Sequence, residues 1–281
     1  MKEFGSIMKD VGGNEGDKCH YSTRLDTYGC GCFHDCSYCY SKSLLSFRNL
    51  WNAEHPSVAD IDEIRKKIRH IRPGEIVRLG GMTDCFQPCE LIHRNTYKTI
   101  KTLNKRRVGY LIVTKSHLVA NPEYMAIYDP ELAHFQITVT TLDDDLSLTY
   151  EKASVPSKRI EAIKTLQKAG FDVAIRLFPL IESHMDFSRL NSLGIDKCVV
   201  EFLRVNSWIE KWFKIDYSKY TVSQSGYHHL PLKEKQRIIQ QIKIPSITVC
   251  EDVTEHYEYW KEHFNPNKED CCNLRRVNNE Q

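Results

Sequence analysis

Long apolar runs are missing from this chain of 281 residues. A membrane-spanning helix requires roughly 20 predominantly apolar residues, and no stretch approaches that length. The first 17 residues are polar and contain glycine, without the apolar segment of a secretory signal. An excess of one charge is missing too, because 39 Lys and Arg residues face 37 Asp and Glu residues. The sequence therefore predicts a cytoplasmic protein without a membrane segment, and its charge alone does not indicate a polyanionic partner.

Cysteine, in contrast, is plentiful, with 11 residues. Without an export signal, disulfides are a weak explanation for them, because reducing compartments do not maintain disulfides. The densest group, Cys32, Cys36 and Cys39, has C-x3-C-x2-C spacing on a short loop. An iron–sulfur cubane normally takes four thiolates, so three would leave one iron open, and open metal positions are where proteins place chemistry. The alternative is a zinc site completed by His34 or Cys30.

The rest of the chain alternates between β-type runs and segments of helical spacing. Six β-type runs of mainly apolar residues stand out: Glu75–Leu79, Val108–Val113, Phe135–Thr141, Val173–Phe178, Cys198–Leu203 and Pro245–Cys250. Strands that alternate with helices of about ten residues indicate βαβ units and a parallel sheet. We therefore predict an α/β fold, a partial (β/α)6 barrel, with a flavodoxin-like open sheet as the geometric rival.

One large domain with short appendages is expected from the length. No internal repeat or low-complexity segment is evident. An irregular lead-in is expected over residues 1–23, the barrel over 24–204, and a C-terminal extension over 205–281, where the periodicity loosens. We expect this extension to cap the active site.

The residues that follow the predicted strands are candidates for that site. Active sites of parallel barrels lie at the C-terminal ends of the strands. These ends carry small or polar residues, whereas the strand bodies are apolar: Gly80, Gly81, Met82, Thr83 and Asp84; Lys115 and Ser116; Thr138, Thr140 and Thr141; Arg176. Two adjacent glycines at a strand end allow close approach of a ligand to the backbone, or mark a tight turn.

Four motifs follow one another along the chain. They are Gly-Cys-x-His-x-Cys-x-Tyr-Cys-Tyr (31–40), Thr-Asp-x-x-Gln-Pro (83–88), Val-Thr-Lys-Ser (113–116) and Thr-Val-Thr-Thr-Leu (138–142). In this order they resemble the radical S-adenosylmethionine (SAM) superfamily, and within it the spore photoproduct lyase-like branch. The resemblance covers roughly residues 28–181.

This resemblance implies a [4Fe–4S] cluster on Cys32, Cys36 and Cys39 whose fourth iron binds SAM. It implies reductive cleavage of SAM to a 5′-deoxyadenosyl radical that abstracts hydrogen from a substrate, with flavodoxin or ferredoxin as electron donor. Lys115 would pair with the SAM carboxylate, or alternatively with Asp84 at the barrel rim. The SAM contacts that the resemblance implies are Tyr40, Gly80, Gly81, Thr83, Asp84, Lys115, Thr138, Thr140 and Arg176.

One departure from the resemblance concerns hydrogen donation. Photoproduct lyase carries a hydrogen-donating cysteine at a position that falls on Gly81, and glycine cannot donate hydrogen in that way. Cys85, and less so Cys89, could replace it, because a thiol is a good hydrogen-atom donor, although a buried cysteine is otherwise an inert small hydrophobe.

The substrate is less well determined than the reaction. The resemblance suggests a nucleobase or nucleotide, in DNA or free, and Trp208, Trp212 and Tyr217 could stack on bases. Modification of a peptide or small metabolite is the alternative within enzymes. A non-catalytic zinc-binding module is the remaining alternative.

The C-terminal cysteines form a last group. Cys250, Cys271 and Cys272 could hold a second cluster, with Cys19 or Cys30 as a fourth ligand, as in many relatives outside this branch. Adjacent cysteines are poorly placed to ligate one cubane together. The sequence therefore favours ordinary thiols or a zinc site here over a second cluster.

Overall fold

A mostly parallel sheet forms the centre of the molecule. The computed structural model describes residues 8–10, 12 and 16–275. Its main sheet has the strand order β1-β2-β5-β6-β7-β8-β9-β12. These strands are β1 (Met8–Asp10), β2 (Thr23–Leu25), β5 (Ile76–Leu79), β6 (Gly109–Thr114), β7 (Ala133–Thr138), β8 (Asp172–Leu180), β9 (Lys197–Phe202) and β12 (Ser246–Val249). All neighbours are parallel except β1 and β2. The predicted α/β fold is confirmed.

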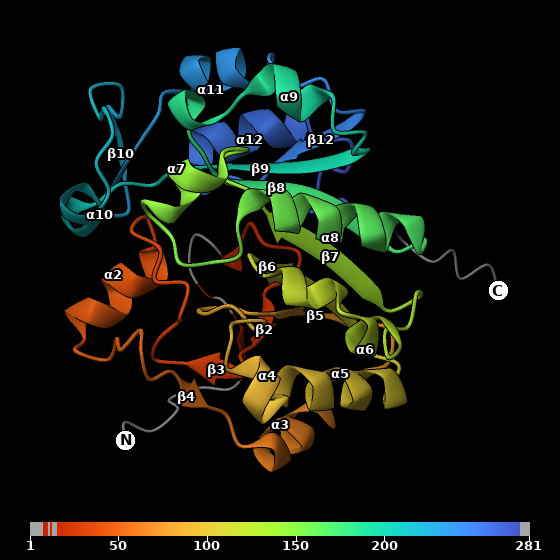
Figure 1. The fold of residues 1–281 in the computed structure, drawn as a ribbon. Helices are drawn as coiled ribbons and strands as arrows, with labels where there is room; N and C mark the ends of the chain where they lie inside the picture. The colour runs from red at the N-terminus through yellow and green to blue at the C-terminus, as the bar shows by residue number, and fades with distance from the viewer. Residues whose placement is uncertain (1–7, 11, 13–15, 276–281) are drawn as a thin grey trace.

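Helices connect these strands and surround the sheet (Figure 1), because parallel neighbours require crossover connections. They are α2 (Tyr40–Phe47), α3 (Ile61–Ile68), α4 (Glu90–His93), α5 (Asn95–Lys105), α6 (Pro122–Met125), α7 (Asp144–Leu148), α8 (Pro156–Lys168), α9 (Phe187–Asn191), α10 (Ser207–Trp212), α11 (Leu232–Ile239), α12 (Thr254–His263) and the 3₁₀ turns η1 (His117–Ala120) and η2 (Glu182–His184). Two small hairpins pair β3 (Tyr28–Gly29) with β4 (Ser57–Val58) and β10 (Val222–Gln224) with β11 (Tyr227–His229). No helix among the described residues has the length and apolar content needed to cross a membrane.

Apolar faces at helical spacing build the core between helices and sheet. Ile64 and Ile68 on α3 are buried in this core, and so is Ile163 on α8. They pack in one cluster with strand residues such as Ile112 and Ile175. This packing holds the strands rigidly, so the loops that follow them have a fixed base.

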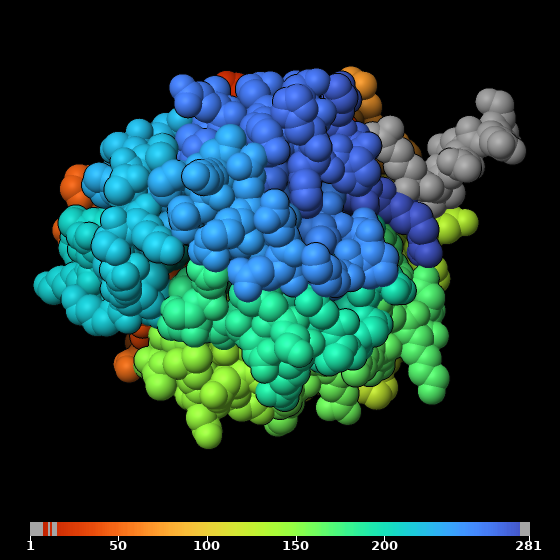
Figure 2. All heavy atoms as spheres, turned by 90° about the horizontal axis from the view of Figure 1, so that it is seen from above, coloured from red at the N-terminus to blue at the C-terminus, as the bar shows by residue number. Residues whose placement is uncertain are grey.

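The C-terminal segments complete the sheet. β12 pairs in parallel with β9, so the sheet continues beyond residue 204, where the extension was expected to begin. α10 lies beside α2 at one end of the molecule (Figure 1). Seen from above, the segments after β9, coloured cyan to blue, cover most of one face (Figure 2). They therefore lie over the barrel rather than apart from it.

Asp172 connects the base of three strands with the C-terminal segment. Its carboxylate lies 2.7 Å from His134 Nδ1 on β7 and 2.6 Å from Lys197 Nζ on β9, and it accepts from the backbone N–H of Arg275 at 2.8 Å. Burial raises the pKa of this carboxyl, but the contacts with His134 and Lys197 outweigh burial and hold the pKa well below its usual range.

We expect Asp172→Asn to lower the free energy of unfolding by about 2 kcal/mol at pH 7, because the buried His134, the half-buried Lys197 and the Arg275 backbone lose a charged acceptor. Since the folded pKa lies below the unfolded value of about 3.9, the contribution is complete above that value and is lost as the pH falls through the folded pKa. Urea unfolding at pH 7, 5 and 3 measures this. Asp62→Asn on α3, whose side chain is 71% exposed, should change stability by less than about 0.5 kcal/mol. An Asp172→Asn deficit that stays constant down to pH 3 would contradict the linkage.

Candidate active site

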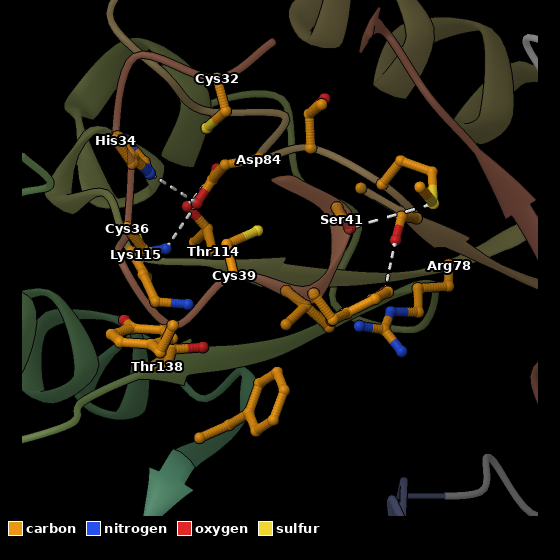
Figure 3. A pocket seen from close by; sticks show the side chains of 18 residues that line it. Cys32, His34, Cys36, Cys39, Ser41, Arg78, Asp84, Thr114, Lys115 and Thr138 are labelled. Carbon is orange, nitrogen blue, oxygen red and sulfur yellow. Dashed lines mark hydrogen bonds and ion pairs between the residues drawn. The ribbon is translucent and has the colours of Figure 1, made fainter. Parts of the chain in front are cut away.

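A cavity opens between the Cys32–Tyr40 loop and the C-terminal ends of β5, β6 and β7 (Figure 3). It contains about 680 Å³ of space when the open solvent at its mouth is included. All three cysteines of the C-x3-C-x2-C motif line it. So do seven of the nine residues expected to contact SAM: Tyr40, Gly80, Gly81, Thr83, Asp84, Lys115 and Thr138.

Backbone hydrogen bonds hold the cysteine loop in place. Ser37 N–H donates to the carbonyl of Tyr150 at 2.9 Å, and Lys152 N–H donates to the carbonyl of His34 at 2.7 Å. At the end of the loop, Cys39 is the N-cap of α2. The segment 150–152 therefore holds the loop through its backbone.

Cys32 and Cys36 are buried, and Cys39 is half-buried. Burial raises the pKa of Cys32 to about 12, with a further contribution from the charge of Asp84. Burial also raises the pKa of Cys36, against the opposing effect of the Lys115 charge. Because metal ligands must be thiolates, metal binding here releases protons. A buried, thiol-rich site of this kind suits a metal cluster.

The spacing of the thiols argues against zinc. No three cysteine sulfurs in the described part of the chain lie within 4.8 Å of one another. Thiolates around one tetrahedral zinc, with Zn–S bonds of about 2.3 Å, would be roughly 3.8 Å apart. The two extra zinc ligands considered from the sequence do not complete such a site. His34 Nδ1 faces Asp84 Oδ2 at 3.3 Å, and Cys30 does not line the cavity.

Asp84 braces the strand-end loops. Its carboxylate accepts from the Thr114 hydroxyl and the Lys115 backbone N–H, both at 2.7 Å, and from Phe86 N–H at 2.8 Å. Burial raises its pKa, but the charge of His34 and these hydrogen bonds lower it to about 2. The carboxylate is therefore ionised and occupied by the protein, and it meets the backbone of Lys115 rather than its ammonium group.

The ammonium of Lys115 faces the cavity without an acidic partner. Its Nζ lies 5.5 Å from the ring centre of Tyr38 and 5.9 Å from that of Phe178. Among the described residues no carboxylate forms an ion pair with it. A cation between aromatic faces and without a counter-ion is well suited to bind the carboxylate of a ligand.

Close packing explains the two glycines after β5. Gly80 has φ +80°, a left-handed conformation that favours glycine. Gly81 N–H donates to Asp26 Oδ1 at 2.6 Å, and a Cβ at Gly81 would lie 2.9 Å from Cβ of Arg24. The Tyr40 hydroxyl donates to the Gly81 carbonyl at 3.1 Å. A cysteine side chain at position 81 would therefore require its neighbours to move.

Three of the residues predicted from the sequence lie elsewhere. The Thr140 hydroxyl is hydrogen-bonded to Tyr150 at 3.0 Å. Arg176 binds Glu201 and Gln136 and lines a neighbouring cavity. Cys85 is 1% exposed and lies in the hydrophobic core, where burial raises its pKa well above the usual value. The geometry gives no support to these three as contacts or donors in the first cavity.

Further residues border the cavity. Met82 was among the strand-end candidates, whereas Arg78, Ser41 and Phe178 were not predicted from the sequence. Arg78 had a recognisable signal, because a charged residue stands within the apolar run of β5 (Ile76–Leu79). Ser41 and Phe178 carry no such signal, since they are ordinary for a helix and a strand.

Comparison with known families shows the family of this chain. The profile of the Radical SAM superfamily matches residues 27–190, which is more than half of the chain and contains every cysteine of the loop. This chain belongs to the radical SAM superfamily. It is therefore a radical SAM enzyme that uses a [4Fe–4S] cluster and SAM and requires a reductant. The recognition made from the four motifs is confirmed.

Solved structures support the same fold. A spore photoproduct lyase variant with bound AdoMet and dinucleoside spore photoproduct is 19% identical, with a TM-score of 0.60 over 83% of this chain and 78% of that chain. Another spore photoproduct lyase variant gives a TM-score of 0.63 at 18% identity, over 86% and 78%. SuiB of Streptococcus suis, bound to its precursor peptide SuiA, gives 0.54 at 12% identity, over 81% and 48%. None of the curated proteins searched matches. These identities show the fold alone.

Proposed function

We propose that this radical SAM enzyme abstracts hydrogen from a nucleobase or nucleotide, in DNA or free. Cys32, Cys36 and Cys39 would hold the [4Fe–4S] cluster, and Lys115 would bind the SAM carboxylate. The observation that carries the proposal is the placement of an acid-free ammonium in the same cavity as the three thiols. When bound, the cluster and SAM supply the reducing electron and the 5′-deoxyadenosyl radical. An external flavodoxin or ferredoxin would deliver the electron.

The other lining residues would contact SAM or position the loops around it. Tyr40, tied to the Gly81 carbonyl, would contact the adenine, and Gly80 and Gly81 would let the backbone approach SAM. The Thr83 hydroxyl already donates to the Tyr28 carbonyl at 2.6 Å, so it would position the loop. Thr138, at the end of β7, would add a hydroxyl.

Lys115→Met should weaken SAM binding by about 10- to 100-fold, because a charge-assisted contact is worth roughly 1.5–3 kcal/mol. Iron and sulfide content should not change, since Lys115 contributes no ligand. Anaerobic calorimetry on reconstituted protein measures the affinity. Lys98→Met on the exposed side of α5 (Asn95–Lys105) is the matched control. Equal SAM affinity in the wild type and Lys115→Met would remove Lys115 from the site.

The proposed nucleic-acid substrate is based on the aromatic side chains of α10, the helix that packs beside α2. Trp208 on α10 is 37% exposed, and its ring lies 5.3 Å from that of Trp212. Lys42 on α2 lies 4.9 Å from the Trp212 ring centre. Aromatic and cationic groups together suit unstacked bases and their phosphates. A solved structure of the same fold contains a dinucleoside photoproduct.

Substrate class can be tested by measuring 5′-deoxyadenosine formation. We expect single-stranded DNA or dinucleosides to stimulate it, whereas unrelated peptides should not. Trp208→Ala should reduce the stimulation about 5- to 100-fold, in line with roughly 1–3 kcal/mol for a stacked base, and should leave uncoupled SAM cleavage unchanged. Leu148→Ala, at another exposed apolar residue, is the control. Stimulation by peptides alone would favour the peptide alternative and overturn the nucleic-acid assignment.

A further inference from the structure

A second cavity adjoins the first. The two share Tyr40, Arg78 and Phe178 in their walls. Four cysteines, none of them part of the C-x3-C-x2-C motif, line the second cavity: Cys19, Cys250, Cys271 and Cys272. They come from three distant parts of the chain, and the radical SAM reaction uses none of them.

The first two parts are bound to each other beside the cavity. Lys18 donates to the backbone carbonyl of Asp252 at 2.6 Å and contacts the Thr254 hydroxyl at 3.0 Å. These bonds hold the segment that contains Cys19 against the segment that follows β12 and contains Cys250. The convergence is therefore built by specific contacts over more than 230 residues of sequence separation.

The third part is anchored by a buried carboxylate. Asp270 accepts from the Tyr21 hydroxyl at 2.6 Å and from Cys272 N–H at 2.9 Å. Asn265, a few residues earlier, exchanges hydrogen bonds with the backbone of Val249 at 2.8 and 3.0 Å. The turn that contains Cys271 and Cys272 is thus fixed against both other segments, and both of its thiols line the same cavity.

Buried hydrogen-bond donors around these thiols lack acceptors. Nε of Arg176 and Nε of Arg78 are buried without a hydrogen-bond partner among the described residues. Arg176 as a whole is 1% exposed. Gln136, which is fully buried, hydrogen-bonds to Cys272. Buried donors are normally satisfied, so this cavity is built for a ligand with several acceptor atoms.

Charge points to an anionic ligand. Five cationic side chains line the cavity: Lys18, Arg24, Arg78, Arg176 and Arg204. The three carboxylates there are Glu201, Glu251 and Asp252, so cations are in excess. Thiolates and inorganic sulfides carry the negative charge that such an environment stabilises, and hydrogen bonds to sulfur tune clusters.

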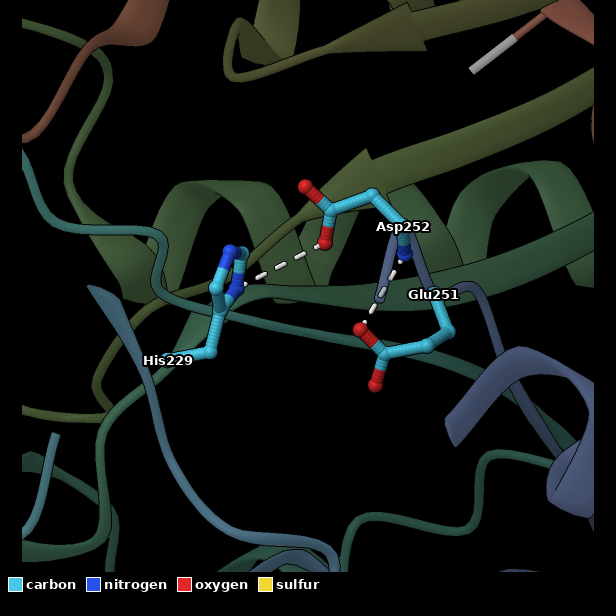
Figure 4. A group of neighbouring side chains, drawn as sticks. All are labelled: His229, Glu251 and Asp252. Atoms are coloured by element: carbon cyan, nitrogen blue, oxygen red, sulfur yellow. Dashed lines mark hydrogen bonds and ion pairs between the residues drawn. The ribbon is translucent and has the colours of Figure 1, made fainter. Parts of the chain in front are cut away.

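A neighbouring acidic group is already neutralised. His229, Glu251 and Asp252 lie together beside the cavity (Figure 4). Glu251 is 2.6 Å from the buried Lys235 ammonium, and Asp252 is 3.4 Å from Arg204. With both carboxylates engaged by cations, this group supports the segment after Cys250 and is not a separate metal site.

The thiols themselves fit a cluster better than a single zinc ion. Cys271 is hydrogen-bonded to Cys250 and to Cys272, but no three described cysteine sulfurs all lie within 4.8 Å of one another, whereas all thiolates around one zinc ion would be roughly 3.8 Å apart.

We propose that Cys19, Cys250, Cys271 and Cys272 bind a second iron–sulfur cluster beside the SAM pocket. Four thiolates complete the coordination of such a cluster, so this site would be closed and would not bind SAM. The sequence favoured ordinary thiols or zinc, because adjacent cysteines are unusual ligands. The structure adds two observations in favour of a cluster: Cys19 supplies a fourth thiol, and buried donors beside the thiols lack acceptors. The proposal depends on no assignment of the substrate.

The test uses a chain that cannot form the first cluster, the triple variant Cys32→Ala/Cys36→Ala/Cys39→Ala. After anaerobic reconstitution with iron and sulfide, it should retain about two to four irons per chain with matching sulfide, visible absorption and an electron paramagnetic resonance signal after reduction. Because no SAM chemistry occurs in this variant, failure of the proposed function would not affect the result. Retention of zinc without sulfide, or of no metal, would overturn the proposal.

Variants in the same background assign the ligands. Adding Cys271→Ala and Cys272→Ala should remove the iron, while adding Cys198→Ala, on β9 and away from the cavity, should not. Circular dichroism establishes which variants are folded. Cys19→Ser, a milder change in the lead-in, should shift the resonance signal or reduce the iron content. Iron and spectra that are unchanged by every one of these cavity substitutions would refute the assignment.

Discussion

Replacing Cys36 with alanine is expected to abolish SAM cleavage. The side chain is buried in the loop of the first cavity, and solvent cannot supply a substitute ligand there. Loss of an outer-shell partner of a metal ligand already costs about 10- to 100-fold, so loss of a ligand should lower 5′-deoxyadenosine formation by more than about 100-fold. The change that SAM causes in the electron paramagnetic resonance spectrum of the reduced protein should disappear together with SAM cleavage.

The matched control is Cys198→Ala, because Cys198 is also fully buried but lies on β9 in the hydrophobic core. It should keep SAM cleavage near the wild-type rate at a stability cost of about 1 kcal/mol. Total iron is not the deciding measurement, since a second cluster would leave iron in Cys36→Ala. Persistent 5′-deoxyadenosine formation by Cys36→Ala would show that the cysteine triad is assigned wrongly.

Local signals explain why so much of this site could be predicted. The spacing of Cys32, Cys36 and Cys39 lies within one loop, and each strand end is marked where an apolar run gives way to polar residues. Because parallel strands carry such ends on one edge, Gly80, Thr138 and their equivalents could be placed together before the structure was known. The order of the six predicted strands is likewise set by chain connectivity.

Side-chain direction could not be predicted in the same way. Arg176 follows the same rule as Lys115, yet Glu201 on the adjacent β9 binds it in the second cavity. Thr140 is engaged by Tyr150 from a later turn. The direction of each of these side chains is set by a hydrogen-bond or ion-pair partner from a later segment of the chain.

The meeting of the four further cysteines is also a tertiary effect. Nothing local places Cys19 near Cys250, because the contact requires β12 to join β9 and the 16–22 segment to fold back across it. The placement of the adjacent Cys271 and Cys272 beside Cys19 and Cys250 has no local signal for the same reason. The turn anchored by Asp270 directs both of them into one cavity.

The largest stability effect is expected from the ion pair beneath the cysteine loop. Glu151 and Arg159 are ion-paired with both side chains fully buried, and the Tyr38 hydroxyl donates to Glu151. Glu151→Gln leaves an unpaired buried guanidinium, so we expect the free energy of unfolding to fall by about 3–5 kcal/mol and the apo protein to melt roughly 6–15 °C lower. Reconstituted clusters should also be lost faster, because residues 150–152 clamp the loop.

Two further variants decide whether burial of the pair is the cause. Glu131→Gln removes an ion pair with Arg107 that is 53–61% exposed, and it should cost less than about 0.5 kcal/mol. Removing both buried charges with Glu151→Leu/Arg159→Met should recover much of the lost stability, because no uncompensated charge remains. If the double variant recovered its stability but still lost its cluster quickly, the carboxylate of Glu151 would be acting on the loop through Tyr38. If Glu151→Gln melted at the same temperature as the wild type, the Glu151–Arg159 ion pair would contribute neither to the stability of the protein nor, through it, to retention of the cluster.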